Sequence, residues 1–221
     1  MRVRADLNIS LDGIAAIADG TPENPFGEDW GRLVAAYLAT RTMQERVMGD
    51  TTGAGTTGVD DTYAAGYFEG IGAEIMGAGK FGLHTYPDDP DWRGWWGDNP
   101  PFHYPVFVLT HTPRPDLEMD GGTTFHFLTA TPQEALERAQ AVAGGKDVRI
   151  GGGPTVMRAF LVAGLIDELH VAIVPLVLAK GVNLWDGLRH LEESFDVTTE
   201  VAPESGTVHV TFTRVEALPI S

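Results

Sequence analysis

The stretch at residues 147–160 constrains the fold of this chain more than any other part of the sequence. A short β-type run at residues 148–150 leads into three glycines, a proline and apolar residues at helical spacing. Glycine permits positive φ angles and lets a ligand approach the main chain, and Pro154 suits the first position of a helix. We therefore predict a strand, a glycine turn and a helix whose free N–H groups form a phosphate site.

The glycines alone are equally consistent with an ordinary tight turn between a strand and a helix. The chain that follows is more specific, because a helix stop at Gly164 precedes a long apolar strand predicted for residues 171–181. Three segments together resemble the dihydrofolate reductase-like superfamily: Ile-Gly-Gly-Gly-Pro-Thr (150–155), Leu-Ile-Asp-Glu-Leu (165–169) and Val-Pro-Leu-Val-Leu-Ala-Lys-Gly (174–181).

Within that superfamily, the chain is most similar to the stand-alone relatives of the reductase domain of bifunctional riboflavin-biosynthesis proteins, over about residues 3–215. The resemblance implies a single α/β domain over residues 1–221, with a mostly parallel central sheet, helices on both faces and an antiparallel C-terminal hairpin. The sheet of the family has eight strands. The resemblance also implies NADPH as the cofactor and a homodimer as the default assembly.

The composition limits the classes of function. The 221 residues include 15 Lys and Arg against 31 Asp and Glu, a formal net charge of −16, which argues against nucleic acid and anionic membranes as partners. The absence of cysteine excludes disulfides, a thiol nucleophile and a cysteine-ligated zinc. The sequence shows no signal peptide and no apolar run of about 20 residues. We expect a soluble, cytoplasmic protein without a metal site.

The first strand is predicted for residues 3–9, and it runs into a Ser-Leu-Asp-Gly turn at residues 10–13. In the family this turn begins the loop that covers the nicotinamide, so the resemblance implies that Asn8 and Ile9 meet the nicotinamide ring. Asp12 is either a substrate contact or only the residue that forms the turn.

A helix is predicted to begin near residue 30, because apolar residues then recur at helical spacing. True dihydrofolate reductases place a catalytic acid near the start of this helix, and Asp29 is our candidate, although it is also suited to capping the helix. Trp30 and, after a tryptophan-rich loop, Phe102 and His103 are predicted substrate contacts. Between them we expect a long loop at residues 46–61, followed by a short helix from Tyr63.

A second glycine-rich strand end lies at Met76 and Gly77. The family usually has an arginine next, which holds the nucleotide phosphates, typically including the 2′-phosphate of NADPH. Ala78 replaces that arginine and removes a bidentate phosphate donor. NADH is therefore an alternative to NADPH, and Lys80 and Arg114 are candidates to supply the missing positive charge.

The resemblance places the cofactor at the ends of several strands. The predicted cofactor-binding residues are Asn8, Ile9, Gly77, Ala78, Lys80, Leu109, Thr110, His111, Gly151, Gly152, Gly153, Pro154, Thr155, Val156 and Met157. In relatives a cis peptide bond joins Gly151 and Gly152. The two glycine-rich strand ends are expected to lie side by side at the carboxyl edge of the sheet, where α/β proteins bind ligands.

We expect an NAD(P)H-dependent reductase that transfers a hydride to a C=N or C=O bond of a small heterocyclic substrate, such as a pterin or a ribitylaminopyrimidine-type compound. One alternative is a true dihydrofolate reductase, which requires Glu28 or Asp29 inside the pocket. The other is a non-catalytic nucleotide- or ligand-binding protein, which the alanine at position 78 favours. A zinc-deaminase activity is excluded because its metal ligands include cysteine.

Overall fold

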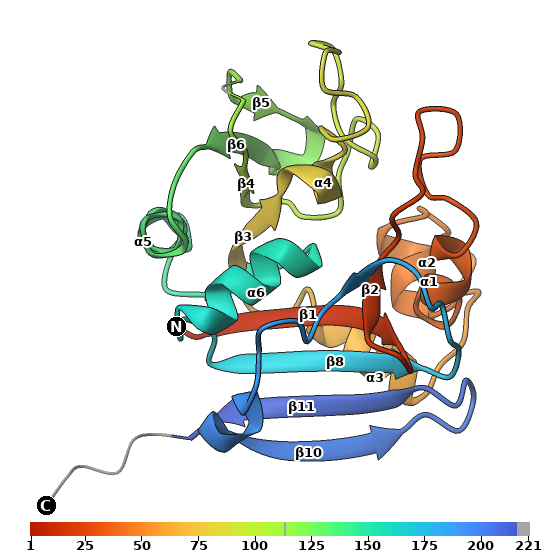
Figure 1. The fold of residues 1–221 in the computed structure, drawn as a ribbon. Helices are drawn as coiled ribbons and strands as arrows, with labels where there is room; N and C mark the ends of the chain where they lie inside the picture. The colour runs from red at the N-terminus through yellow and green to blue at the C-terminus, as the bar shows by residue number, and fades with distance from the viewer. Residues whose placement is uncertain (113, 216–221) are drawn as a thin grey trace, which may run out of the picture.

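Strand and helix patterns alternate along this chain, and they assemble into one large sheet with helices on both faces (Figure 1). The computed structural model describes residues 1–112 and 114–215. The strands of the large sheet are β1 (Val3–Ser10), β3 (Ile71–Gly77), β4 (Pro105–Leu109), β5 (Leu117–Glu118), β6 (Thr124–Leu128), β7 (Asp147–Ile150), β8 (Glu168–Val174), β10 (Phe195–Val201) and β11 (Val208–Arg214).

The remaining elements cover this sheet or connect its strands. They are the helices α1 (Trp30–Leu38), α2 (Arg41–Arg46), α3 (Val59–Gly66), α4 (Ala78–Phe81), α5 (Pro132–Val142) and α6 (Pro154–Val162), the 3₁₀ turns at Asp120–Gly122 and Leu191–Ser194, and the strands β2 (Ile14–Ala16) and β9 (Val182–Asn183). The strands β2 and β9 form a separate two-stranded sheet.

The order of strands in the large sheet is β10-β11-β8-β1-β7-β3-β4-β6-β5. All neighbouring pairs from β8 to β6 are parallel, whereas β11 pairs antiparallel with both β8 and β10. The predicted mostly parallel α/β sheet with an antiparallel C-terminal hairpin is therefore confirmed. The short strand β5 adds a ninth strand antiparallel to β6, beyond the eight that the resemblance implied.

The two faces of the sheet differ in chemistry because the residues of β1 alternate. Val3, Ala5 and Ile9 join an apolar core with the helices α5 and α6, which include the fully buried Phe160. The alternate residues, such as Asp6, point to the opposite face, where α1, α2 and α3 cover the sheet. Figure 1 shows α6 in front of the sheet, α5 at its left side and α1 to α3 behind it or at its right-hand end.

Three local predictions are wrong. The strand predicted for residues 171–181 ends at Val174, because Pro175 has no N–H to continue the ladder. The helix predicted from Tyr63 begins at residue 59, where Gly58 with a φ of 148° lets the chain turn. The cis peptide bond joins Gly152 and Gly153 rather than Gly151 and Gly152.

Candidate functional site

The two glycine-rich strand ends lie side by side, as predicted. The N–H of Gly77 donates to the carbonyl of Gly152 at 2.9 Å, and the N–H of Gly151 donates to the carbonyl of Ile75 at 2.9 Å. Because Gly151 still pairs with β3 in this way, the chain leaves the sheet one peptide later, at the cis bond between Gly152 and Gly153. We call this junction of β3 and β7 the glycine corner, defined by residues Gly77, Gly151, Gly152 and Gly153.

Three glycines of the corner differ in the space around them. A Cβ on Gly77 would lie 2.8 Å from Cγ2 of Val156, so a side chain there would push α6 away. A Cβ on Gly151 would lie 2.0 Å from Oε1 of Glu74 and 2.7 Å from Nζ of Lys80. A Cβ on Gly153 would meet no atom within 4 Å. Gly153 therefore borders open space, where a ligand can press against the corner.

The helix α6 begins at the corner with Pro154 at its first position. Gly153 is its N-cap and supplies no side-chain cap, so the N–H groups of Thr155 and Val156 have no helical partner. The side chain of Met157 is fully buried in the core, and only its backbone belongs to the turn. Free N–H groups at a helix start suit an anionic group such as a pyrophosphate.

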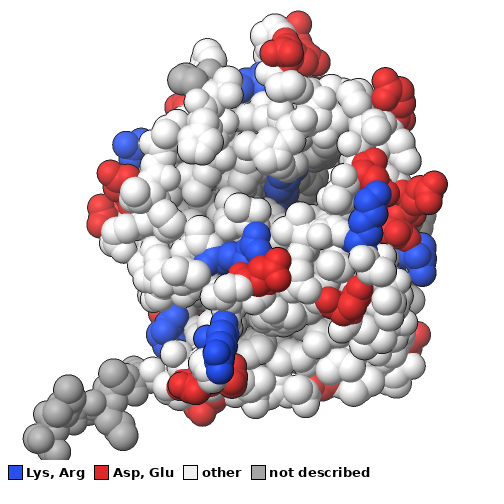
Figure 2. All heavy atoms as spheres, in the orientation of Figure 1, with Lys and Arg blue, Asp and Glu red and all other residues white. Residues whose placement is uncertain are grey.

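The surface is hollowed at this corner. Figure 2 shows a depression between α4 above and α6 below, with a basic group at its floor. The side chain of Lys80, in α4, is 26% exposed. The strand β4 forms the next wall, because Leu109 pairs with Gly77 in register. Thr110 follows, 9% exposed, and its hydroxyl accepts from the N–H of Thr112, while His111 is exposed.

Behind the corner lies a buried cluster of charges from three adjacent strands. Arg149 of β7 donates from Nε to Oδ2 of Asp6 at 2.6 Å and from Nη1 to Oε2 of Glu74 at 3.0 Å. The other carboxylate oxygen of Glu74 accepts from Nζ of Lys80 at 3.1 Å. Glu74 is 0% exposed and Arg149 is 5% exposed. Such buried charges persist only when they are paired.

Both candidate replacements for the missing arginine already donate hydrogen bonds within the protein. Lys80 turns its ammonium inward, where it donates to Glu74 and also to the carbonyl of Gly151 at 2.6 Å. Arg114 donates to the carbonyls of Pro90 and Trp92. Ala78, the first residue of α4, is 9% exposed and packs in the core. The corner therefore offers backbone donors for a nucleotide, and its nearest cations are already paired.

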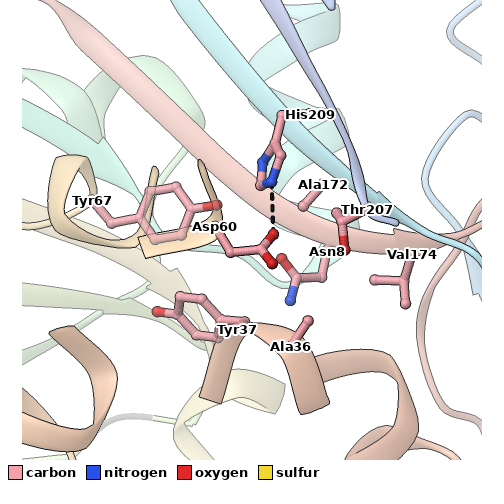
Figure 3. Close-up of a pocket in the computed structure, with 9 residues that line it drawn as sticks. All are labelled: Asn8, Ala36, Tyr37, Asp60, Tyr67, Ala172, Val174, Thr207 and His209. Atoms are coloured by element: carbon pink, nitrogen blue, oxygen red, sulfur yellow. Dashed lines mark hydrogen bonds and ion pairs between the residues drawn. The ribbon is translucent and has the colours of Figure 1, made fainter. Parts of the chain in front are cut away.

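The strand β1 brings Asn8 and Ile9 within one strand of the corner, on opposite faces. Ile9 is 1% exposed in the apolar core. Asn8 lines a small cavity of about 10 Å³ with Tyr37, Asp60 and His209 (Figure 3), which is room for about one water. The predicted nicotinamide contact of both residues stays a prediction, and only Asn8 faces a cavity.

Asp12 holds the loop after β1 to the loop after β8. Its carboxylate accepts from the hydroxyl of Ser10 at 2.6 Å and from the N–H groups of Leu178 at 3.1 Å and Ala179 at 2.7 Å. The bond from Ser10 and the backbone bond from Leu178 lower the pKa of Asp12 to about 2. Its carboxylate thus has a structural role, whether or not it also meets a substrate.

Asp29 and Glu28 lie at the surface. Asp29 occupies the N-cap position of α1 but makes no capping hydrogen bond, and it pairs instead with the exposed Arg32. Glu28 is exposed. The condition that a true dihydrofolate reductase sets, an acid of this segment inside the pocket, is not met.

The predicted substrate contacts are spread over different surroundings. Trp30 stacks on Phe26 with ring centroids 4.6 Å apart, and Phe26 in turn meets Trp95 at 4.8 Å. Phe102 is 5% exposed and belongs to the core under the tryptophan-rich loop. His103 is exposed, and its Nδ1 lies 2.8 Å from the carbonyl of Gly121. The structure does not bring these three predicted contacts together, so their roles stay predictions.

A chain of buried polar side chains was not anticipated from the sequence. Tyr67 OH lies 2.9 Å from Nδ1 of His170, whose Nε2 lies 3.0 Å from Nδ1 of His209. Nε2 of His209 lies 2.8 Å from Oδ1 of Asp60, the contact dashed in Figure 3. The ring of Tyr63 stacks on both histidines. Burial, and then repulsion by His209, lower the pKa of His170 to about 3.

A second cavity, of about 240 Å³, lies under α3. Its lining includes Arg4, Asp6, Tyr63, Arg149 and His170. Arg4 and Glu168, which also lines it, stand near the amino ends of β1 and β8, whereas the glycine corner lies at the carboxyl ends of β3 and β7. Among the helices of the described residues, none is long and apolar enough to cross a membrane. In the same residues, no group of three or more His, Asp or Glu side chains is placed to hold a metal ion.

Comparisons with known proteins agree with this geometry. The sequence profile described as the RibD C-terminal domain matches residues 2–218. No curated protein sequence matches the chain. Among solved structures, one described as a riboflavin biosynthesis protein of Shewanella sp. PV-4 aligns with a TM-score of 0.55 at 23% identity, covering 98% of this chain and 100% of that one.

Two further solved structures align with the chain. RibD of Acinetobacter baumannii aligns with a TM-score of 0.52 at 15% identity, covering 97% of this chain and 58% of that one. The dihydrofolate reductase of Enterococcus faecalis aligns with a TM-score of 0.48 at 12% identity, covering 97% of each chain. The match of the profile over nearly the whole chain confirms the family that the resemblance implied, and with it the fold.

Proposed function

The chain belongs to the RibD C-terminal domain family of reductases, and on that premise we propose that it uses NADPH to deliver a hydride to a C=N or C=O bond of a small heterocycle. The observation that supports the proposal is the glycine corner. Gly77 and Gly152 join the two strand ends, Gly153 borders open space, and α6 begins beside them with unpaired N–H groups. This arrangement fits the pyrophosphate of a dinucleotide.

In this proposal the backbone of residues 153–157 binds the pyrophosphate, and the ends of β3 and β4 line the rest of the nucleotide. When bound, the reduced nicotinamide supplies the hydride, so the chain itself needs to bind, orient and exclude water. The substrate class that fits the family is a pterin or an aminopyrimidine with a sugar-derived chain. We also propose a homodimer and a cytoplasmic location, and light scattering of the purified protein tests the first of these.

The choice of NADPH over NADH rests on the family, because Ala78 removes the usual phosphate-binding arginine. Lys80 and Arg114 are engaged elsewhere. We therefore expect NADPH to bind through backbone donors, with a smaller advantage over NADH than a bidentate arginine would give.

Binding is tested by titrating the protein with NADPH and with NADH, followed by quenching of tryptophan fluorescence. A matched pair of variants locates the site. Gly153→Leu places a side chain in the open space at the corner, where its Cβ meets no atom within 4 Å. Gly31→Leu does the same on the exposed side of α1, where a Cβ also meets no atom within 4 Å.

We expect Gly153→Leu to weaken NADPH binding at least tenfold and Gly31→Leu to leave it unchanged. Equal effects of the two variants would place the nucleotide elsewhere. Failure of the parent protein to bind either nucleotide would refute the proposal. Binding without NADPH oxidation, in the presence of dihydropterin or a ribosylaminopyrimidine, would favour the non-catalytic alternative.

A further inference from the structure

Lys80 occupies an unusual position at the glycine corner. It lies in α4, directly after β3, yet its ammonium reaches across to the carbonyl of Gly151 at the end of β7, at 2.6 Å. A second N–H points to Glu74 at 3.1 Å. An ammonium has three N–H donors, so within the described residues one remains available. The side chain is 26% exposed.

The sequence makes room for this ammonium. Any Cβ at position 151 would lie 2.7 Å from Nζ of Lys80 and 2.0 Å from Oε1 of Glu74. The glycine at position 151 is therefore required by the Lys80–Glu74 pair, whereas Gly153 is the glycine that leaves space for a ligand. The Lys80–Glu74 pair is therefore packed directly against the glycine corner.

Charged groups from three strands surround the ammonium: Glu74 of β3, Arg149 of β7 and Asp6 of β1. Tyr104, just before β4, donates to Oε2 of Glu74 at 3.3 Å. Glu74 is shared between Arg149 and Lys80. Its single negative charge therefore compensates Lys80 only in part.

These surroundings favour proton release. Burial lowers the pKa of Lys80, and the positive charge of Arg149 adds to this effect, whereas Glu74 and Asp6 oppose it. A general acid is most effective when its pKa lies near the working pH. Lysine is suited to such tuning because it changes its protonation state readily when it is buried.

On the basis of the proposed function, we propose that Lys80 is the proton donor of the reduction. As the substrate carbon gains the hydride from the reduced nicotinamide, the π electrons of its C=N or C=O bond move to the nitrogen or oxygen. That atom takes a proton from Nζ of Lys80. The nicotinamide is left oxidised, the substrate is reduced by two electrons, and the neutral amine of Lys80 regains a proton from water at its exposed side.

The variants Lys80→Met and Lys80→Arg test this role, with Lys146→Met at an exposed site as the matched control. Two readouts are needed: NADPH affinity from tryptophan quenching, and NADPH oxidation with dihydropterin and a ribosylaminopyrimidine from pH 6 to pH 10. We expect Lys80→Met to lower kcat about 100-fold or more, as is typical for loss of a general acid, with NADPH affinity within threefold. Lys80→Arg keeps the charge but gives up no proton, so it should not restore the rate.

The pH profile separates proton donation from a merely structural role. In the parent protein, kcat/KM should fall at alkaline pH as Lys80 loses its proton, and this fall should disappear in Lys80→Met. A variant with kcat within threefold of the parent and an unchanged profile would overturn the inference while leaving the proposed function intact. Failure of the parent to bind NADPH would instead refute the proposed function, on which the inference depends.

A measurement that needs no substrate complements these rates. The sequence has three lysines, Lys80, Lys146 and Lys180, so each ε-carbon can be followed by NMR in protein labelled with ¹³C-lysine. We expect Lys80 to titrate at a lower pH than an ordinary lysine side chain and to shift when NADPH is added. If Lys80 titrates at the ordinary pH of a lysine, the proposal is wrong.

Discussion

The two faces of the central sheet are built in opposite ways. The face under α5 and α6 is apolar, with Ile75, Val148 and Phe160 all fully buried. The face under α1 to α3 carries ionised and polar groups, among them Glu74 and Arg149, which are nearly as deeply buried. The same strands serve both faces, because successive residues of a strand point in opposite directions.

The difference separates residues that stabilise from residues that are available for chemistry. Apolar burial is non-directional and roughly proportional to area, so the apolar face tolerates changes that preserve volume. A buried ion pair adds little net stability, but removing one partner leaves an unpaired charge. The polar face therefore depends on the identity of each residue. It also leads directly to the glycine corner through Glu74 and Lys80.

The largest effect expected from this contrast is that of Arg149→Met. Methionine fills much of the same space but leaves the carboxylates of Asp6 and Glu74 without their main partner. Breaking a buried pair in this way costs about 3–5 kcal/mol of unfolding free energy. Urea denaturation at pH 7.5 measures it. A loss of unfolding free energy below about 1 kcal/mol would mean that the polar face tolerates substitution as well as the apolar face does.

The next effect is a pH dependence specific to the polar face. In the folded state the pKa of His170 is about 3, whereas an unfolded histidine titrates near pH 6.5. Between these values the unfolded state takes up a proton that the folded state does not, so stability falls as the pH drops below about 6.5. At pH 5, protonation of His170 in the unfolded state lowers the free energy of unfolding by about 2 kcal/mol, at roughly 1.4 kcal/mol per pH unit.

His170→Asn should remove this contribution, and His190→Asn, at an exposed site, is the control. The quantity to compare is the change in unfolding free energy between pH 7.5 and pH 5.0, because carboxylates elsewhere also contribute. If the parent and His170→Asn lose the same amount, His170 does not stay neutral in the folded protein.

A smaller effect is expected on the apolar face. Met157 is fully buried in the core between α6 and the sheet, and Met157→Leu preserves most of its volume. Such a swap usually costs less than about 1.5 kcal/mol. Compared with Arg149→Met in the same denaturation experiment, it shows whether the two faces differ in tolerance. A cost equal to that of Arg149→Met would remove the contrast between the faces.

The smallest effect concerns the start of α5, outside both faces. Thr131 accepts from the N–H of Glu134, and the carboxylate of Glu134 accepts from the N–H of Thr131, which is a capping box. Thr131→Ala should destabilise the protein by about 1 kcal/mol without changing NADPH binding. A change in NADPH affinity would show that α5 is coupled to the corner.

Much of the fold and the position of the corner could be predicted from the sequence, because both depend on local patterns. Strand and helix periodicity, the proline after the glycines and the Thr131 cap each act within a few residues. The strand at 171–181 was predicted too long because apolar residues continue past Pro175 into a loop. The spacing of apolar residues does not show that Pro175 lacks the N–H group needed to continue the hydrogen bonding of the strand.

The polar face could not be predicted in the same way. Arg149 pairs with Asp6, 143 residues away, and with Glu74, 75 residues away, and such contacts depend on the strand order. A signal existed, since Arg149 lies between the apolar residues Val148 and Ile150. The direction of the Lys80 side chain could not be predicted either, because it depends on the position of Glu74 in the folded sheet.

The contact between Lys80 and Gly151 has a consequence for how the corner tolerates change. One side chain from α4 bridges to the last carbonyl of β7, in addition to the backbone bond between Gly77 and Gly152. Any residue at position 80 with a shorter reach would leave that carbonyl to be hydrated. Substitutions at this single position are therefore expected to alter how much water enters between the two strand ends.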